Sequence, residues 1–336
     1  MERDPSTTTT RRRLLGTAAA ATGAVIATAA LAREAAAATV GPTTNLSSPV
    51  RGGATAGTFG FELAGVQQGL LRGADGGDTY ADVILDTGGL KHLGPPKLDD
   101  FTVDFGLSGL SPSFYEFAVN LMSWRTVETT GKLLSGDVTR NVTAARAFTN
   151  ARFSELAIPA LNAGSKDAGF LSLSFSADSA SDATPAGTIQ SQPPTGTTRW
   201  LTSNFRLEID DALGAAHVDC TRVSKIDAIT ITDNGSRVEF PNLVVSFSAV
   251  SLPGWKDWFN DFVVNGNNGQ TKERSGRIML LGLTPTTVLG VLQLHNIGIY
   301  KLDPDGEANP GGPARAIAEL YVETMNFSQL GTWVNS

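Results

Sequence analysis

The sequence has few of the residues from which metal centres and disulfide-stabilised folds are built. Its 336 residues include one cysteine, Cys220, and three histidines, His92, His217 and His295. A single cysteine excludes an intrachain disulfide framework and a cysteine-based zinc site. Three scattered histidines argue against a histidine-rich metal site. We expect Cys220 to be buried, because its neighbourhood alternates apolar and polar residues.

Charge and long apolar runs are also scarce. Charged residues make up 18% of the chain, and 26 basic against 33 acidic residues give a net charge of −7. No basic run occurs after residue 33, so a nucleic-acid partner is not expected. The stretch over 14–31 is mostly Ala, Thr and Gly, whereas a membrane span needs about 20 strongly apolar residues. The hydrophobic content of 41% is nevertheless sufficient for an ordinary core.

The N-terminus has the pattern of an export signal. Residues 10–15 read Thr-Arg-Arg-Arg-Leu-Leu, which resembles the twin-arginine signal, and Ala36–Ala38 form a small-residue cleavage site. We predict a twin-arginine signal peptide over 1–38, followed by a flexible arm over 39–56; an Ala-rich amphipathic or membrane-anchoring helix is the alternative. The peptide carries five basic and three acidic residues, so its removal changes the net charge from −7 to −9.

The rest of the chain contains two segments that resemble each other. Phe59–Leu63 resembles Phe205–Ile209 at an offset of 146 residues, and Phe148–Leu156 resembles Leu294–Leu302 at the same offset. Between the two units, 178–199 has the composition of a linker. We therefore predict a tandem duplication.

Both units are predicted to be mainly β with one helix each. Alternation with a period of two over 169–178 and 316–327 is typical of half-buried strands. Helices are expected near Pro112 and Pro253, where bulky side chains recur at helical spacing. These side chains should pack each helix on a sheet, and a ligand platform is the alternative. They are Phe114 and Phe117 in the first unit and Trp255, Trp258 and Phe262 in the second.

Patterns of the common enzyme classes are absent from the sequence. There is no GxSxG, HExxH, Walker loop or dinucleotide fingerprint. Glu62 and Glu208 could form a glycosidase pair, but duplicated strand positions explain them better. Asp303, Asp305 and Glu307 resemble a calcium loop without EF-hand spacing, and a solvated hairpin turn is the preferred interpretation. We expect no catalytic residue, no cofactor and no metal; an exported hydrolase is the weakest alternative.

The order of these features resembles the tail tube proteins of contractile phages and contractile injection systems. In the second unit a segment with basic residues and a Gly, Lys272–Leu281, follows the helix. A strand over 292–302, a turn over 303–312 and a closing strand with Glu319 and Glu323 come next. The resemblance implies two tandem tube-like domains, each a β-sandwich or barrel. They are expected over residues 57–177 and 200–330.

The resemblance implies a structural protein that assembles with itself. Six tube-fold domains form a ring in this family, so a chain with two domains would close as a trimer with pseudo-sixfold symmetry. Stacked rings would form a hollow tube, built outside the membrane because of the export signal. Polar residues on one face of the strands would line the lumen or a subunit contact. These residues are Glu62, Glu208, Glu319, Tyr321 and Glu323.

Partners and location follow from this interpretation. The expected partner is a further copy of the chain, with a cap or anchor protein as another candidate and with membrane contact only during export. The protein is expected in the periplasm, at the cell surface or outside the cell. The alternative function is a monomeric, exported all-β binding module for surface polysaccharide or another ligand. It would use two long loops, over 65–100 and 211–238.

Overall fold

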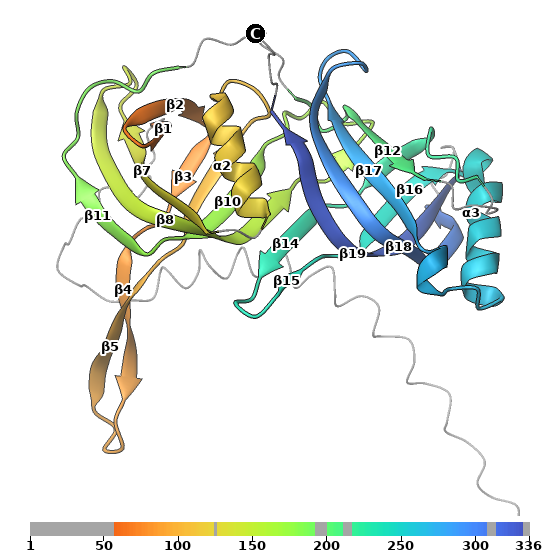
Figure 1. The fold of residues 1–336 in the computed structure, drawn as a ribbon, viewed down its shortest axis with the longest axis horizontal. Coiled ribbons are helices and arrows are strands. Elements are labelled where there is room, and N and C mark those ends of the chain that lie inside the picture. The colour runs from red at the N-terminus through yellow and green to blue at the C-terminus, as the bar shows by residue number, and fades with distance from the viewer. Residues whose placement is uncertain (1–56, 124–125, 192–199, 211–216, 308–313, 332–336) are drawn as a thin grey trace, which may run out of the picture. The chain divides into compact units, whose positions relative to one another are not determined.

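The computed structural model describes residues 57–123, 126–191, 200–210, 217–307 and 314–331. Within these residues the chain is mainly β, as predicted, with two sheets, one separate hairpin and two α-helices (Figure 1). The predicted signal peptide over 1–38 and the arm over 39–56 lie outside the described residues. Neither of the two helices is long and apolar enough to cross a membrane.

The first sheet is built mainly from residues before 184. Its strands follow the order β2-β1-β7-β8-β10-β6-β3, all antiparallel, and β11 pairs with β8. The helix α2, Pro112–Met122, begins where the Ser111 hydroxyl accepts a hydrogen bond from the Phe114 amide. The strands are β1 (Thr58–Leu63), β2 (Val66–Leu71), β3 (Gly73–Asp75), β6 (Phe101–Phe105), β7 (Val127–Gly136), β8 (Val142–Ile158), β10 (Leu171–Ser176) and β11 (Ser179–Ala183).

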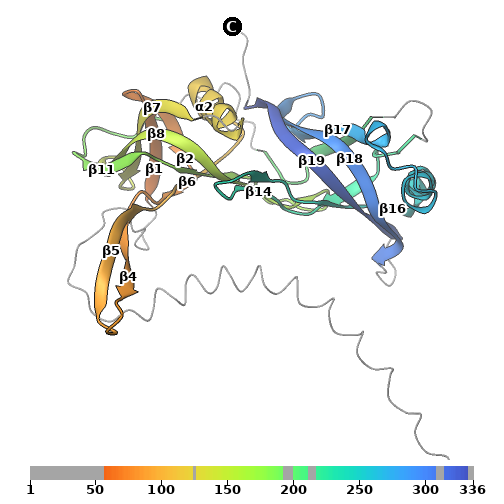
Figure 2. The same cartoon turned by 60° about the horizontal axis from the view of Figure 1, so that its bottom comes forward.

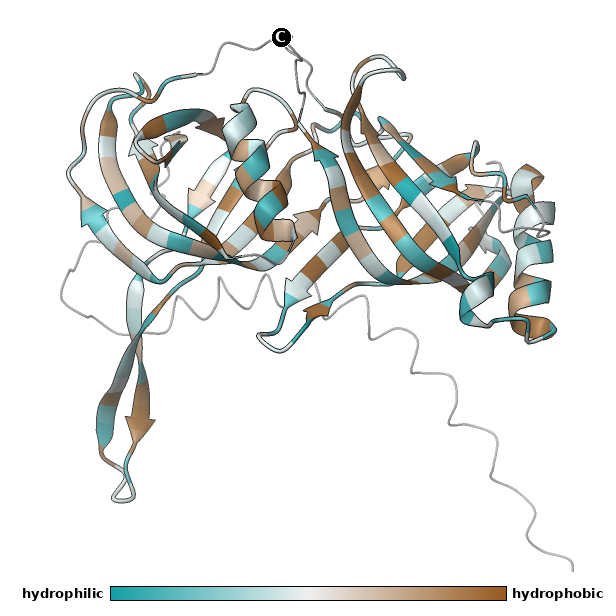
Figure 3. Cartoon of the chain, in the orientation of Figure 1, coloured by the Kyte–Doolittle hydropathy of each residue, from teal (hydrophilic) through white to brown (hydrophobic). Residues whose placement is uncertain are grey.

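The second sheet is built mainly from residues after 200. Its order is β12-β17-β18-β19-β16-β13-β9. A 3-10 turn over Ala249–Ser251 leads into helix α3, Leu252–Phe259, which continues as a π-helix over Asn260–Val264. The strands are β9 (Leu161–Asn162), β12 (Phe205–Ile209), β13 (Val223–Ile226), β16 (Leu243–Ser248), β17 (Arg274–Leu281), β18 (Val288–Glu307) and β19 (Arg315–Leu330). Apolar and polar residues alternate along β18 and β19 (Figure 3), as half-buried strands require.

Six strands follow the same order in both sheets. The first sheet contains β1-β7-β8-β10-β6-β3, and the second contains β12-β17-β18-β19-β16-β13. The helices also occupy the same place in the chain, α2 between β6 and β7 and α3 between β16 and β17. The two sheets thus share one connection pattern.

A single antiparallel ladder joins the two sheets. Strand β14, Ile229–Asp233, pairs with the end of β8, and β9 pairs with β13 in the same register. Ile229 lies opposite Ile158, and Ile231 lies opposite Leu156, all of them buried. Helix α2 adds a second contact because it packs against β19. The apolar residues on both sides therefore belong to one continuous core.

The segment predicted as a linker, 178–199, differs from that prediction where the structure describes it. Ser179–Ala183 form β11 along β8, and Ile189 is 2% exposed. Composition indicated a linker because the segment is rich in Ser, Thr and Pro. The free edge of β8 offers backbone partners that composition does not reveal. Residues 192–199 lie outside the described part of the chain.

Both segments predicted as long loops contain paired strands where the structure describes them. The first, over 65–100, contains β2, β3 and the hairpin β4–β5. The second, over 211–238, contains β13 and β14, and β14 pairs with β15, Val238–Glu239. The predicted turn over 303–312 starts later than expected, because β18 extends to Glu307. Strands β3 and β4 have no buried residue, so their sequences lack the alternation that identifies a half-buried strand.

Candidate functional site

A hairpin of two strands extends away from the first sheet (Figures 1 and 2). Strand β4 covers Thr79–Leu85 and strand β5 covers Lys91–Leu98. Among the described residues, each of these strands pairs only with the other. A lone two-stranded hairpin is marginally stable in water at best. This hairpin is therefore the element of the described fold that most needs a partner.

The hairpin carries the densest group of exposed apolar side chains. Val83 and Leu93, which lie opposite each other, are 62% and 74% exposed. Both faces are affected, because Val83, Ile84 and Leu85 are consecutive and all exposed. Burial of one such side chain contributes about 1.5–3 kcal/mol. Contiguous exposed apolar surface of this kind marks an interaction site.

Local polar contacts hold the hairpin at its tip and near its base. The Asp86 carboxylate accepts hydrogen bonds from the amides of Gly88 and Leu90, each at 2.8 Å. The Leu90 amide, followed by the His92 ring, lowers the pKa of Asp86. Near the base, Lys97 forms an ion pair with Asp82. The tip is thus held as a defined turn rather than as an open loop.

The two edges of the hairpin differ in what they can bind. Strand β5 contains Pro95 and Pro96, which have no amide hydrogen to donate. Two consecutive prolines disrupt hydrogen bonding along a strand edge and discourage pairing with a further strand. Strand β4 contains no proline. The free edge of β4 is therefore the one suited to accept another strand.

Two of the predicted lumen or contact residues are paired across strands within their own sheet. Glu62 on β1 accepts a hydrogen bond from the Lys132 ammonium of β7 at 2.6 Å. Glu208 on β12 accepts one from the Arg277 guanidinium of β17 at 2.7 Å. Both glutamates lie on the face of their sheet opposite to the buried one. The ion pairs occupy equivalent positions, on the first strand and the strand that follows the helix.

The other three predicted residues lie on β19 of the second sheet. Glu319 accepts hydrogen bonds from the Lys301 ammonium at 2.5 Å and from the Tyr300 hydroxyl at 2.7 Å. These two contacts, with Lys301 the larger, lower the pKa of Glu319. Glu323 accepts a hydrogen bond from the Asn296 side chain at 2.5 Å. Both carboxylates thus have partners within the chain, an ammonium for Glu319 and a neutral amide for Glu323.

Tyr321 has a different environment from the glutamates. Its ring covers Gly298 on β18, where a Cβ atom would lie 2.2 Å from the ring. Its hydroxyl donates a hydrogen bond of 2.8 Å to Glu273, and its ring centroid lies 6.3 Å from that of Phe262. Burial, followed by the Glu273 carboxylate, raises the pKa of Tyr321. Tyr321 thus packs against its own sheet and the end of the helical segment.

The residues predicted to pack the helices are all buried. Phe114 and Phe117 lie against Phe61 of β1, with ring centroids 5.2 and 5.5 Å away. Trp255 stacks on Phe247 of β16 at 4.5 Å. Trp258 and Phe262 continue this apolar face along the helical segment, and both are less than 5% exposed. No ligand platform is left open on these faces within the described residues.

The calcium-like segment lies at the end of β18. Asp303 and Asp305 are exposed, and the Asp303 carboxylate accepts a hydrogen bond from the Asp305 amide at 3.1 Å. Glu307 belongs to the same strand by its backbone. In the part of the chain that the structure describes, no group of three or more His, Cys, Asp or Glu residues could hold a metal ion.

Sequence reasoning missed the exposed hairpin and the short hairpin β14–β15. The second could have been identified from Asn234-Gly235, the strongest short signal of a tight hairpin turn, between ITITD and RVEF. The first has Asp86 before Gly88 and Gly89 as a turn signal. Its consecutive apolar residues and Pro95–Pro96 conceal the alternation expected of a strand.

Comparison with known proteins finds distant structural likeness only. No family model and no curated protein matches the chain. A chain of the sheath–tube complex of an extracellular contractile injection system, PVC, in the extended state is similar at 17% identity, with 42% of this chain and 99% of that chain covered and a TM-score of 0.31. The tube-terminating cap of the anti-feeding prophage is similar at 17% identity, with 43% of this chain and 95% of that chain covered and a TM-score of 0.31. The PVC sheath/tube terminator is similar at 16% identity, over 38% of this chain and 93% of that chain, with a TM-score of 0.29. The likeness covers less than half of this chain, and it does not by itself assign a function.

Proposed function

We propose that the chain is an exported structural protein that assembles with itself into rings of three copies, which stack into a hollow tube or filament outside the membrane. The proposal includes a tandem duplication, so that each ring has six similar domains. The order of features in the sequence, which resembles that of tail tube proteins, motivates the ring. The shared strand order of the two sheets supports the duplication.

The exposed apolar hairpin is the observation that carries the proposal. A protein that functions as a monomer rarely leaves Val83, Ile84, Leu85, Leu90 and Leu93 uncovered on one projecting element. A partner that covers this surface recovers the free energy of apolar burial. Since β4 also offers an open strand edge, backbone pairing with another copy would complete the hairpin.

The test is the mass and appearance of the full chain in solution. Light scattering after size exclusion should give a mass of three chains, or a multiple of it where rings stack, and negative-stain images should contain rings or stacked rings. A mass of one chain at high protein concentration, unchanged by salt or divalent ions, would exclude self-assembly. It would favour the monomeric binding module. That alternative depended on two long loops, over 65–100 and 211–238, and both segments contain paired strands where the structure describes them.

A further inference from the structure

The ladder that joins the two sheets uses one hairpin and one strand edge, and the described part of the chain has a second, unpaired copy of each. These are the hairpin β4–β5 of the first half and the free edge of β18 in the second half. We propose that a second copy docks head to tail by the same ladder, with β4 of one copy added to the free edge of β18 of the next. This rests on the proposed self-assembly and specifies the surfaces and the register that it uses. The partner is therefore a further copy of this chain.

Strands β8 and β18 have equivalent edges. Strand β7 stops pairing with β8 at Ala151, and β17 stops pairing with β18 at Ile297, 146 residues later. Four residues beyond Ala151, Glu155 pairs with Thr232 of β14. Four residues beyond Ile297, the edge at Lys301 has no strand partner among the described residues. The edge of β18 is thus the open equivalent of the edge that β14 occupies on β8.

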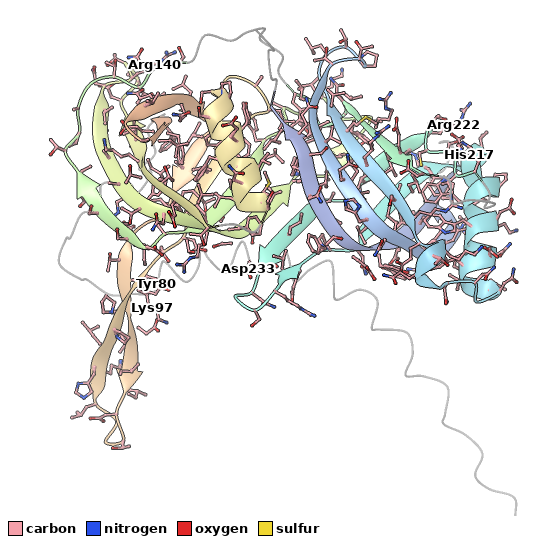
Figure 4. The ribbon with its side chains drawn as sticks, viewed as in Figure 1. Tyr80, Lys97, Arg140, His217, Arg222 and Asp233 are labelled. Atoms are coloured by element: carbon pink, nitrogen blue, oxygen red, sulfur yellow. The ribbon has the colours of Figure 1, made fainter. Side chains whose placement is uncertain are left out.

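The hairpins β4–β5 and β14–β15 are equivalent at their bases. The hairpin β4–β5 follows β3, which pairs with β6, and Ala74 lies opposite Val103. The hairpin β14–β15 follows β13, which pairs with β16, and Ile226 lies opposite Val245. Six residues after Ala74, Tyr80 pairs with Lys97. Six residues after Ile226, Thr232 pairs in the same way with Glu239. Figure 4 labels Tyr80 and Lys97 on the long hairpin and Asp233 on the short one.

Together these equivalences fix a register. Within the chain Thr232 lies opposite Glu155, so between chains Tyr80 should lie opposite Lys301. Thr79 should then lie opposite Leu302. Tyr80 and Lys301 are both exposed, and Leu302 is half-buried, so this edge is accessible. The prolines of β5 leave β4 as the hairpin edge that is suited to this pairing.

The helices provide an independent indication of the same surface. On α2, Tyr115, Ala118 and Met122 form a second apolar face, and all three are at most 3% exposed. This face meets the second half of the chain, because a Cβ atom at Gly331 after β19 would lie 2.4 Å from the Tyr115 ring.

The corresponding face of α3 and of the π-helix that continues it is less apolar and more exposed. Aligning Pro112 with Pro253 places Lys256, Phe259 and Val263 at the equivalent positions. Lys256 is exposed, Phe259 is half-buried and Val263 is 39% exposed. The free edge of β18 corresponds to the edge of β8 that β14 covers. The exposed face around Lys256 and Val263 corresponds to the face of α2 that the second half of the chain covers. A second copy would cover both at once.

Cysteine cross-linking tests the register directly. In a Cys220→Ser background, the full-length single variants Tyr80→Cys and Lys301→Cys are mixed and oxidised. Directly opposite residues place their Cβ atoms about 4.5–5.5 Å apart, within reach of a disulfide. We expect a reducible dimer in the mixture and none in either variant alone. The double variant Tyr80→Cys/Lys301→Cys should give a ladder of products that ends at three chains.

Two controls make the result specific. The double variant Glu155→Cys/Thr232→Cys uses the corresponding pair within the chain and should form an intrachain disulfide, which shows that the fold and the oxidation conditions are sound. A mixture of Tyr80→Cys with Asp305→Cys moves the partner four residues along β18, about 13 Å, and should not cross-link. Val263→Glu should reduce the Tyr80–Lys301 cross-link at least fivefold, whereas Val138→Glu, on the β7–β8 turn, should not.

The outcomes separate this inference from the function on which it rests. If the full chain forms oligomers but the Tyr80→Cys and Lys301→Cys mixture yields no dimer, the head-to-tail register is wrong and self-assembly stands. The register is equally wrong if the Asp305→Cys mixture cross-links as well as the Lys301→Cys mixture. If the unmodified chain stays monomeric at every concentration, both the register and the proposed function are overturned.

Discussion

Asn150 and Asn296 are 146 residues apart in the chain and have the same left-handed backbone, with φ angles of 53° and 54°. Each lies within the long middle strand of its sheet, β8 or β18. Each also donates a side-chain hydrogen bond to a carboxylate, Asn150 to Asp178 and Asn296 to Glu323 of β19. Asn tolerates this conformation better than most residues do. The two long strands thus use the same residue at the same bend.

Substitution of these asparagines should distinguish backbone strain from the lost hydrogen bond. Asn296→Val should lower the free energy of unfolding by about 1–3 kcal/mol, since a β-branched residue is strained at positive φ. Asn296→Gly removes the side chain but relieves the strain, and it should cost less than Asn296→Val. Urea unfolding of the three proteins measures both differences. Equal losses for the two variants would contradict a strained backbone at this position.

Charge placed on the exposed hairpin should impair assembly without impairing the fold. Val83→Lys with Leu93→Lys puts two like charges on opposite residues of the apolar surface. We expect the mass in light scattering to fall to that of one chain, while the circular dichroism spectrum is retained. The matched control is Val138→Lys, also exposed but on the β7–β8 turn. Oligomers that survive the double change would show that the hairpin is not a contact.

Acid should weaken the start of helix α3 through Asp219. The Ser251 hydroxyl, at 2.6 Å, and then the Thr221 hydroxyl lower the pKa of Asp219 from 3.8 to about 2. Because the folded state favours the charged form, this contribution is complete above pH 3.8 and is lost as the pH falls to about 2.

Asp219→Asn should remove this pH dependence and part of the stability at neutral pH. We expect a loss of about 1–2 kcal/mol at pH 7, after allowance for solvent screening. The difference in the free energy of unfolding between the variant and the unmodified chain should shrink as the pH falls from 3.8 to about 2. Urea unfolding at a series of pH values measures it, and Asp257→Asn, an exposed carboxylate of the same helix, is the control. A difference that does not change with pH would contradict the assignment.

Cys220 should react slowly while the protein is folded. Cys220 is half-buried, less than the burial predicted from the alternation around it. This partial burial, the largest influence, raises the pKa of its thiol to about 12, so very little thiolate is present at pH 8. A disulfide reagent should therefore modify the native chain about 100-fold or more slowly than the urea-unfolded chain. Equal rates in the two states would mean that Cys220 is accessible. An interchain disulfide at this position is not expected.

Export should depend on the arginine pair near the N-terminus. Arg11→Lys with Arg12→Lys keeps the charge but removes the two guanidinium groups of the signal pattern. We expect the variant to stay in the cytoplasm of a host that has the twin-arginine route. Arg33→Lys, outside the pattern, should be exported normally. Export of the double variant would refute the proposed signal.

The regular parts of the fold could be predicted because their residues are half-buried. Alternation identified β10 and the first half of β19, and a proline followed by spaced aromatic residues identified α2 and α3. The hairpin β4–β5 has no buried face within the chain, so its sequence lacks the alternation of a packed strand. Its apolar residues Val83, Ile84 and Leu85 are consecutive and exposed, which is not the pattern expected of a packed strand.

The contact between the sheets could not be predicted from sequence patterns. Pairing of β14 with β8 joins residues more than 70 positions apart, and neither segment specifies its partner. The polar residues proposed for a lumen illustrate the same difficulty. Alternation placed Glu319 and Tyr321 on one face, but it gave no indication that Lys301 and Glu273 would be their partners. Local pattern determines which side a residue faces, whereas non-local packing determines what it meets there.

The unequal lengths of the two hairpins have a consequence for the proposed filament. Between the equivalent base pairs, the hairpin β4–β5 is ten residues longer than β14–β15. In a ring of three chains, long and short hairpins would alternate, which leaves three projecting arms rather than six. The next ring could then be seated in three rotational settings instead of six. A small insertion in one half of the chain would thereby restrict the helical twist of the whole filament.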